Sequence, residues 1–315
     1  MKKSARWILY FCLGLCLVAG GLVTSAWLSP VRDSRRFGVT YMTMNNPFYE
    51  VVNTEIARVV RESGDELIVR DPELDLDRQI EQIYDFIAME VDGIFVNPID
   101  SQKIGPALQA ARAAGIRIIS VDVPAESESV HANVVSDNRQ AGELCALSVR
   151  ERFDEANILV LCHSAVDSAR ERVEGFEELL EGKKDYRIVE RIECEGQVEI
   201  AMPLVEKALQ SHPEIDIIFC LNDPSAVGAL AAMEKTGRED LAVYAVDGTP
   251  ELKTFIQEGK YDIRTVAQFP IRMGQEAARQ MYLALEDAGS CQDQTLRVEM
   301  ISPANISKYD TQGWQ

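Results

Sequence analysis

The chain has 315 residues, of which 46% are hydrophobic and 26% charged, and its formal net charge is −19. A chain of this length can bury a sizeable core and favours two domains over one. The negative charge disfavours nucleic-acid binding, because an acidic surface repels phosphate backbones. None of the seven cysteines forms a C-x-x-C pair, which argues against a zinc ribbon or a thioredoxin-type redox motif.

Three of the cysteines lie in or beside apolar runs, namely Cys162, Cys194 and Cys220. We expect them to be buried as small hydrophobic residues. Outside the N-terminal region the number of cysteines is odd, so at least one of those thiols has no disulfide partner in the chain.

Residues 1–30 are typical of a targeting segment. Basic residues within the first six positions precede an uncharged stretch from Trp7 to Leu28, as in secretory signal peptides and membrane anchors. The small residues at 24–26 suit signal-peptidase cleavage, whereas the length of the stretch suits an uncleaved anchor. A lipoprotein is disfavoured, because the bulky Leu15 directly precedes Cys16. Both remaining interpretations place the rest of the chain outside the cytoplasm, in the periplasm or on the outer face of the cell membrane.

From residue 37 onward, short apolar runs alternate with stretches of helical periodicity. The runs predict strands at 37–43, 66–70, 93–96, 117–121, 158–161, 187–192, 215–221, 241–246, 263–267 and 296–301. Between them we expect helices at 47–63, 76–90, 104–114, 139–152, 169–180, 198–210, 225–235, 250–257 and 273–287. This alternation predicts parallel sheets with helices on both faces, in two successive doubly wound α/β domains. Ligands bind such sheets beyond the carboxyl ends of the strands.

The residues after the first predicted strand do not form a nucleotide-binding loop. They lack G-x-G-x-x-G, and no G-x-x-x-x-G-K-[ST] sequence occurs elsewhere. Instead, Asn46, Phe48 and Tyr49 stand at the start of a helix. Asn46 suits a helix cap as well as a ligand contact. An amide beside two aromatic rings also suits a sugar, which has an apolar face and a polar rim.

Later apolar runs end in polar residues: Asp122, the pair Asn222 and Asp223, Asp247 and Gln268. Each alone is an ordinary turn or cap residue. Together they place carboxylates and amides along one edge, and Arg172 adds a guanidinium from the start of a helix. Carboxylates accept hydrogen bonds from adjacent hydroxyls, amides donate and accept, and arginine donates in a fork. The set therefore predicts a site for a small polyol.

The sequence contains no recognisable catalytic or metal-binding set. Its histidines are His131, His163 and His212, and no two of them share metal-ligand spacing with a carboxylate. His163 follows a predicted strand and is a candidate ligand contact. No G-x-S-x-G nucleophile motif is present. We therefore expect no catalytic residues, no metal and no cofactor.

Seven motifs in the same order resemble the ribose-type periplasmic sugar-binding proteins, which are the substrate-binding components of ABC transporters. The motifs lie at 45–49, 97–100, 136–138, 169–176, 222–223, 246–250 and 267–270. The resemblance implies a type I periplasmic binding protein, with two Rossmann-like lobes joined by three crossing strands and the ligand clamped between them. The residues implied to contact the ligand are Asn46, Phe48, Tyr49 and Asp122 from the first lobe and Arg172, Asn222, Asp247 and Gln268 from the second lobe and hinge.

The resemblance also implies the extent of each lobe. The N-terminal lobe comprises residues 36–136 plus 269–297, and the C-terminal lobe comprises residues 137–268 plus 298–315. Three departures from the ribose pattern affect the pocket: Val123 replaces an arginine, residues 193–196 lack a stacking phenylalanine, and Met42 replaces a small hydroxyl residue. These changes favour another monosaccharide, a cyclitol or a different small polyol over ribose.

The sequence thus predicts an extracytoplasmic, monomeric solute-binding protein that is not an enzyme and delivers its ligand to an ABC-type membrane permease. The alternative is a membrane-anchored sugar sensor that signals to a receptor kinase or a chemoreceptor. More distant alternatives are an α/β enzyme and the effector domain of a sugar-responsive repressor. The repressor is disfavoured because an apolar segment stands where a helix-turn-helix would be expected.

Overall fold

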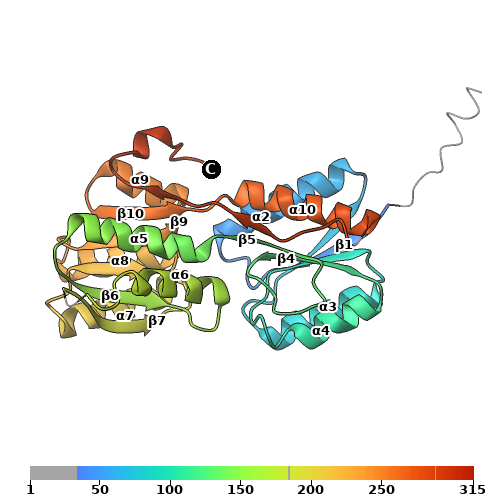
Figure 1. Cartoon of the computed structure of the whole chain (residues 1–315), viewed down its shortest axis with the longest axis horizontal. Coiled ribbons are helices and arrows are strands. Elements are labelled where there is room, and N and C mark those ends of the chain that lie inside the picture. Colours follow the sequence, from blue (N-terminus) through green and yellow to red (C-terminus); the bar gives the residue numbers. More distant parts are fainter. Residues whose placement is uncertain (1–33, 184, 288) are drawn as a thin grey trace, which may run out of the picture. The chain divides into compact units, whose positions relative to one another are not determined.

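The computed structural model describes residues 34–183, 185–287 and 289–315. The predicted targeting segment, residues 1–30, lies outside the described residues. Residues 35–315 form one compact unit. Within the part of the chain that is described, no helix is both long and apolar enough to cross a bilayer. The described elements build two six-stranded sheets, each covered by helices (Figure 1).

The first sheet has the strand order β11-β5-β4-β3-β1-β2, and all its strand pairs are parallel. Its strands are β1 (Arg36–Thr40), β2 (Glu66–Arg70), β3 (Gly93–Val96), β4 (Arg117–Asp122), β5 (Ala132–Ser136) and β11 (Gln294–Leu296). Helices α2 (Pro47–Glu62) and α10 (Pro270–Glu286) cover one face, and α3 (Leu76–Ala88) and α4 (Gly105–Ala113) cover the other (Figure 1).

The second sheet has the order β12-β10-β9-β8-β6-β7. Its strands are β6 (Ala156–Cys162), β7 (Tyr186–Glu193), β8 (Ile217–Cys220), β9 (Ala242–Asp247), β10 (Asp262–Ala267) and β12 (Glu299–Ile301). Helices α5 (Asn138–Arg152) and α6 (Asp167–Glu178) pack on one face, and α7 (Val198–Ser211), α8 (Asp223–Thr236) and α9 (Pro250–Glu258) pack on the other. The short 3-10 helix η1 (Ile306–Lys308) contacts α9.

The predicted fold class, two doubly wound α/β lobes, is confirmed by these sheets. Three predictions about the strands were wrong. Strand β5 was missed, because its five residues alternate between buried and half-exposed instead of forming a continuous apolar run. The single strand expected at 296–301 is two strands, β11 and β12, which belong to different sheets. The second sheet is also not wholly parallel, because β12 runs antiparallel to β10.

The chain passes between the sheets three times: after β5, after β10, and between β11 and β12. The residue boundaries assigned to the two lobes remain predictions.

Polar residues at the ends of strands begin the helices that follow. Asp137 accepts a hydrogen bond from the backbone N–H of Gln140 at the start of α5. Thr249 caps α9 in the same way. A cap satisfies backbone N–H groups that have no partner inside the helix. The residue types that end strands are therefore also those that fix where the next helix begins.

Helices α5 and α6 approach each other so closely that two glycines are required at their crossing. A Cβ atom added to Gly142 would lie 1.9 Å from the carbonyl oxygen of Arg172, and one added to Gly175 would lie 2.2 Å from that of Arg139. Backbone therefore packs directly on backbone, without intervening side chains. Since Arg172 lies at this crossing, the close packing of α5 on α6 also fixes the distance of its side chain from the sheet.

Replacing Gly142 by alanine tests this crossing. We expect Gly142→Ala to lower the free energy of unfolding by about 2 kcal/mol, because a methyl group must push the helices apart. The control is Glu151→Ala, an exposed position of α5 away from the crossing, where the change should stay below about 1 kcal/mol. Urea unfolding followed by circular dichroism measures both. Equal stability of the two variants would contradict the close crossing.

Candidate functional site

All eight residues predicted to contact a ligand line one cavity of about 200 Å³. They are Asn46, Phe48, Tyr49, Asp122, Arg172, Asn222, Asp247 and Gln268. They come from the carboxyl ends of β4, β8, β9 and β10 or the residues just after them, from the first turn of α2 and the residue just before it, and from the second turn of α6. The strands of each sheet end at a common edge, and the edges of both sheets contribute to one cavity, so residues more than 200 positions apart meet there.

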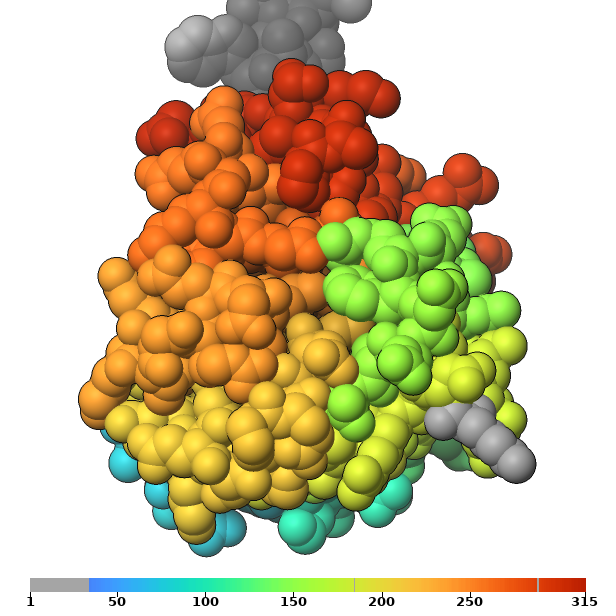
Figure 2. Space-filling model, turned by 90° about the vertical axis from the view of Figure 1, so that its left-hand side faces the viewer, coloured from blue at the N-terminus to red at the C-terminus, as the bar shows by residue number. Residues whose placement is uncertain are grey.

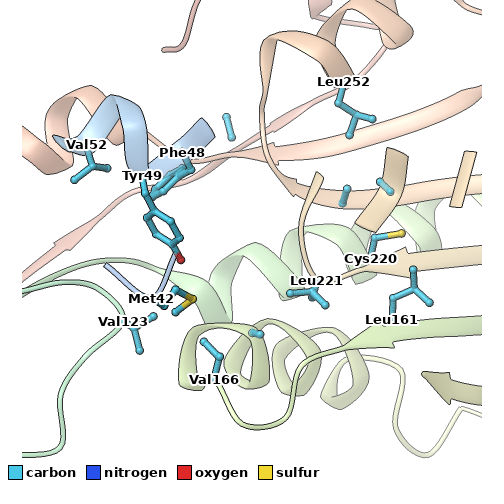
Figure 3. Close-up of a cluster of buried hydrophobic side chains, with 14 of the residues drawn as sticks. Met42, Phe48, Tyr49, Val52, Val123, Leu161, Val166, Cys220, Leu221 and Leu252 are labelled. Carbon is cyan, nitrogen blue, oxygen red and sulfur yellow. The ribbon is translucent and has the colours of Figure 1, made fainter. Parts of the chain in front are cut away.

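The first turn of α2 supplies the aromatic wall of the cavity (Figure 3). Phe48 and Tyr49 are 3% and 6% exposed, and their rings meet edge to face at 5.7 Å. Asn46 is the helix cap, since its Oδ1 accepts a hydrogen bond from the Phe48 backbone N–H at 3.0 Å. The cap and the cavity wall are therefore built by the same turn. Asn46 is the helix cap and lines the cavity, and its contact with a ligand stays a prediction.

Asp122 lies at the end of β4 with only 4% of its surface exposed. Its φ of +67° is in the left-handed region, which turns the chain sharply after the strand. The Tyr49 hydroxyl donates to its Oδ2 at 3.2 Å. Its Oδ1 has no hydrogen-bond partner among the described residues. Burial raises the pKa of Asp122, and the positive charge of Arg172 opposes this rise.

Arg172 and Asp247 form the buried ion pair of the cavity. Arg172 Nη1 lies 3.6 Å from Asp247 Oδ1, and the two side chains are 5% and 4% exposed. Gln268 Nε2 donates to the same Oδ1 at 2.7 Å, whereas Gln268 Oε1 has no partner among the described residues. Burial raises the pKa of Asp247, against the influence of Arg172. The cavity is thus lined by a fixed guanidinium and by two residues, Asp122 and Gln268, that each hold a buried acceptor oxygen without a partner among the described residues.

Two further groups hold Arg172 in place. Its Nε donates to Asn138 Oδ1 at 2.9 Å, and its Nη1 donates to the Leu221 carbonyl oxygen at 2.9 Å. Asn138 lies in the 136–138 motif, but its role as a support for arginine was not foreseen. The signal in the sequence was the motif alone, because nothing in the spacing links position 138 to position 172.

Asn222 joins the cavity to the loop after β7. Its Nδ2 donates to the Gly196 carbonyl oxygen at 3.0 Å, and its Oδ1 accepts from the Ser225 backbone N–H at 3.0 Å. Gly196 has a φ of +67°, and a Cβ there would lie 2.7 Å from Asn222 Nδ2. A glycine is therefore required at 196, and the loop presents backbone to the cavity instead of an aromatic ring.

Asp223 is buried beneath the site and does not line the cavity. It accepts hydrogen bonds from Thr265 Oγ1 at 2.6 Å and from the Thr249 backbone N–H at 2.7 Å. These bonds fix the loop that carries Asp247. Of the adjacent pair at 222–223, one residue thus lines the cavity and the other supports it, a distinction that turn propensity does not reveal.

The C-terminal segment, residues 302–315, packs against α9 (Figure 2). Lys253 Nζ donates to Gln315 Oε1 at 3.0 Å, and Gln315 Nε2 donates to the Asp247 carbonyl oxygen at 3.2 Å. The Trp314 ring meets Phe48 edge to face at 5.8 Å. This segment therefore contacts both the loop of Asp247 and the aromatic wall. The sequence analysis assigned it no role.

Other lining residues extend the polar surface of the cavity. His163, the candidate contact from sequence, lines it together with Glu195 and Glu199. Burial lowers the pKa of His163, which favours the neutral imidazole. Among the residues that the structure describes, no group of three histidine, cysteine or acidic side chains is placed to hold a metal ion. Cys145, Cys162, Cys194 and Cys220 are free thiols. Cys194 and Cys220 are buried as expected, whereas Cys162 is partly exposed.

Asp122→Asn tests the electrostatic cost of the empty cavity. Because the folded state raises the pKa of Asp122, ionisation opposes folding increasingly as the pH rises from the unfolded pKa to the folded one, and fully above the folded pKa. Asparagine removes this cost and tolerates a positive φ. We expect the ligand-free variant to be more stable than the original protein by on the order of 1 kcal/mol at pH 7.5.

The difference should decrease as the pH falls toward the ordinary aspartate pKa of 3.8 and vanish below it, because protonation then removes the charge in both the folded and the unfolded state. Thermal unfolding of both proteins between pH 4 and pH 8 measures it. A variant that is less stable at pH 7.5, or a difference that does not change with pH, would contradict this account.

Known proteins share this sequence pattern and this fold. The profile of the family described as periplasmic binding protein domain matches residues 37–289. The chain is 29% identical to the ribose import binding protein of Bacillus subtilis (strain 168), over 88% of this chain and 91% of the relative. It is 26% identical to the D-apiose import binding protein of Paraburkholderia graminis, over 98% of both chains. An ABC transporter solute binding protein from Mycobacterium smegmatis with bound glycerol superposes with a TM-score of 0.82 at 26% identity, over 87% of this chain and 96% of that one. As the motifs predicted, the chain belongs to the family of periplasmic binding proteins.

Proposed function

We propose that this protein is an extracytoplasmic solute-binding protein that clamps a monosaccharide or cyclitol between its lobes and delivers it to an ABC-type permease. The observation that carries the proposal is the convergence of eight polar and aromatic side chains from both sheets on one small cavity. The cavity volume of about 200 Å³ lies below the roughly 300–1,000 Å³ typical of larger ligand sites. A ligand of the size of a monosaccharide suits it.

The chemistry of the cavity favours a ligand with several hydroxyl groups. Asp122 Oδ1 and Gln268 Oε1 are buried acceptors without partners among the described residues. A buried polar atom without a hydrogen bond costs about 1–3 kcal/mol. A polyol supplies donors to both acceptors, and its apolar C–H face suits the Phe48 ring. The binding of ligand thus relieves a cost that the empty protein carries.

The relatives support the same substrate class. Two of them are named for import of the sugars ribose and D-apiose, and a third holds glycerol, a small polyol. The ribose pattern itself is not retained, because Val123 is apolar and 1% exposed and Met42 is apolar and 7% exposed. We therefore propose a polyol other than ribose.

Closure on ligand is the mechanism that this architecture supports. The site takes side chains from both sheets, and three connections pass between these sheets. Hinge motion about the connections would close the cavity, and a permease would recognise the closed form. No catalytic step is required of any residue in the cavity. We propose a monomer that does not bind nucleic acid.

The sensor remains the second candidate, and the N-terminal segment separates the two. An uncleaved anchor at residues 1–30 favours a sensor that signals to a receptor kinase or a chemoreceptor. Cleavage within 24–26 and release of soluble protein favour transport. The mass of the protein isolated from its own cells decides between them.

A thermal-shift screen of the purified protein against pentoses, hexoses, cyclitols and amino acids tests the function. We expect a polyol to stabilise the fold, by about 2.7 kcal/mol when it is present at a hundred times its Kd. Asp247→Ala should abolish this shift, because it removes an acceptor and leaves Arg172 without its ionic partner. The matched control is Asp85→Ala, an exposed carboxylate in α3 outside the cavity.

The ligand-free melting curve shows whether Asp247→Ala is folded, and Gln268→Leu provides a second variant that removes an unpartnered acceptor. Stabilisation by amino acids or peptides alone would contradict the proposed function.

A further inference from the structure

The charges that line the cavity do not balance. Four carboxylates line it, namely Asp122, Asp247, Glu195 and Glu199, whereas Arg172 is the one lysine or arginine among its described lining residues. Asp122 and Asp247 are buried, and the two glutamates are exposed at the mouth. The site therefore carries more negative than positive charge before any ligand binds.

Arg172 is already engaged by other groups. Its ion pair is with Asp247, and its hydrogen bonds go to Asn138 and to the Leu221 carbonyl oxygen. Asp122 takes part in no ion pair among the described residues, and Arg172 acts on it only over a longer distance. Of the two buried carboxylates of the cavity, that of Asp122 thus lacks a direct cationic partner.

The surroundings of Asp122 do not provide that partner. The next residue, Val123, is apolar and 1% exposed. Oδ1 of Asp122 is buried, without a hydrogen-bond partner among the described residues, in a residue that lines the cavity. An unpaired buried charge is among the most costly features of a folded protein. A partner must therefore come from the ligand if Asp122 is to be ionised in the complex.

We propose that the ligand carries a protonated amine as well as hydroxyl groups, as an amino sugar or an aminocyclitol does, and that its ammonium group donates to Asp122 Oδ1. This inference rests on the proposed function and narrows its substrate class. An ammonium group brings a positive charge and three donors, and hydrogen bonds between two charged groups are stronger than those between neutral ones. The exposed glutamates at the mouth attract a cation toward the cavity.

Pairs of ligands that differ only in one substituent test the proposal. The probes are D-glucose and D-glucosamine, D-galactose and D-galactosamine, and myo-inositol with an inosamine, each titrated calorimetrically into the purified protein at pH 7. We expect the amine to bind at least about tenfold more tightly than its hydroxyl partner in one or more pairs, as for a charge-assisted hydrogen bond. Asp122→Asn should reduce that ratio to about one.

A matched variant and a clear alternative make the test decisive. Asp85→Asn, which removes an exposed carboxylate outside the cavity, should leave the ratio unchanged. If the neutral member binds more tightly in every pair and Asp122→Asn leaves its affinity unaltered, Asp122 is a protonated donor to a hydroxyl oxygen. The inference is then wrong while the proposed function stands. If a neutral polyol of the screen binds and none of the three amines does, the inference is also wrong while the proposed function stands. If neither a polyol of the screen nor an amine binds, the proposed function fails as well.

Discussion

The buried pair of Arg172 and Asp247 is the interaction on which the site depends. Its members come from α6 and from the end of β9. Because an unpaired buried charge is costly, the pair ties the position of α6 to the register of the sheet. Gly142 permits the close approach of α5 that sets the height of this guanidinium. Asp223, which does not line the cavity, supports the loop of the partner carboxylate.

Around this pair, the cavity contains polar atoms that the protein does not satisfy by itself. Asp122 Oδ1 and Gln268 Oε1 are buried acceptors without partners among the described residues. Burial raises the pKa of both aspartates of the cavity, because a carboxylate charge is less stable in the empty site than in water. The empty protein is therefore less stable, and a ligand that donates to these atoms binds more tightly because it removes this cost. For the same reason, Asp122→Asn should stabilise the empty protein and reduce its preference for an amine over the corresponding hydroxyl ligand.

The sequence predicts the fold class and the eight lining residues because both follow from local patterns. Apolar runs that end in Asp122, Asp247 and Gln268 place these side chains at the carboxyl ends of strands, Asp122 in the first sheet and the other two in the second, where parallel sheets bind ligands. The rest depends on tertiary contacts that leave no local trace. Neither the role of Asn138 as a support for Arg172 nor the contact of Trp314 with Phe48 can be read from spacing. The short edge strands β11 and β12 were merged into one, because two residues between strands of different sheets give no turn signal.

The account claims that a ligand completes the hydrogen bonds of this cavity. The crystal structure of the protein with the tightest binder from the screen tests it most directly. We expect the ligand between the two sheets, with donor groups within hydrogen-bond distance of Asp122 Oδ1 and Gln268 Oε1, and with Arg172 donating to a ligand oxygen. A ligand bound elsewhere, or one that leaves both acceptors without partners inside the occupied cavity, would contradict the account.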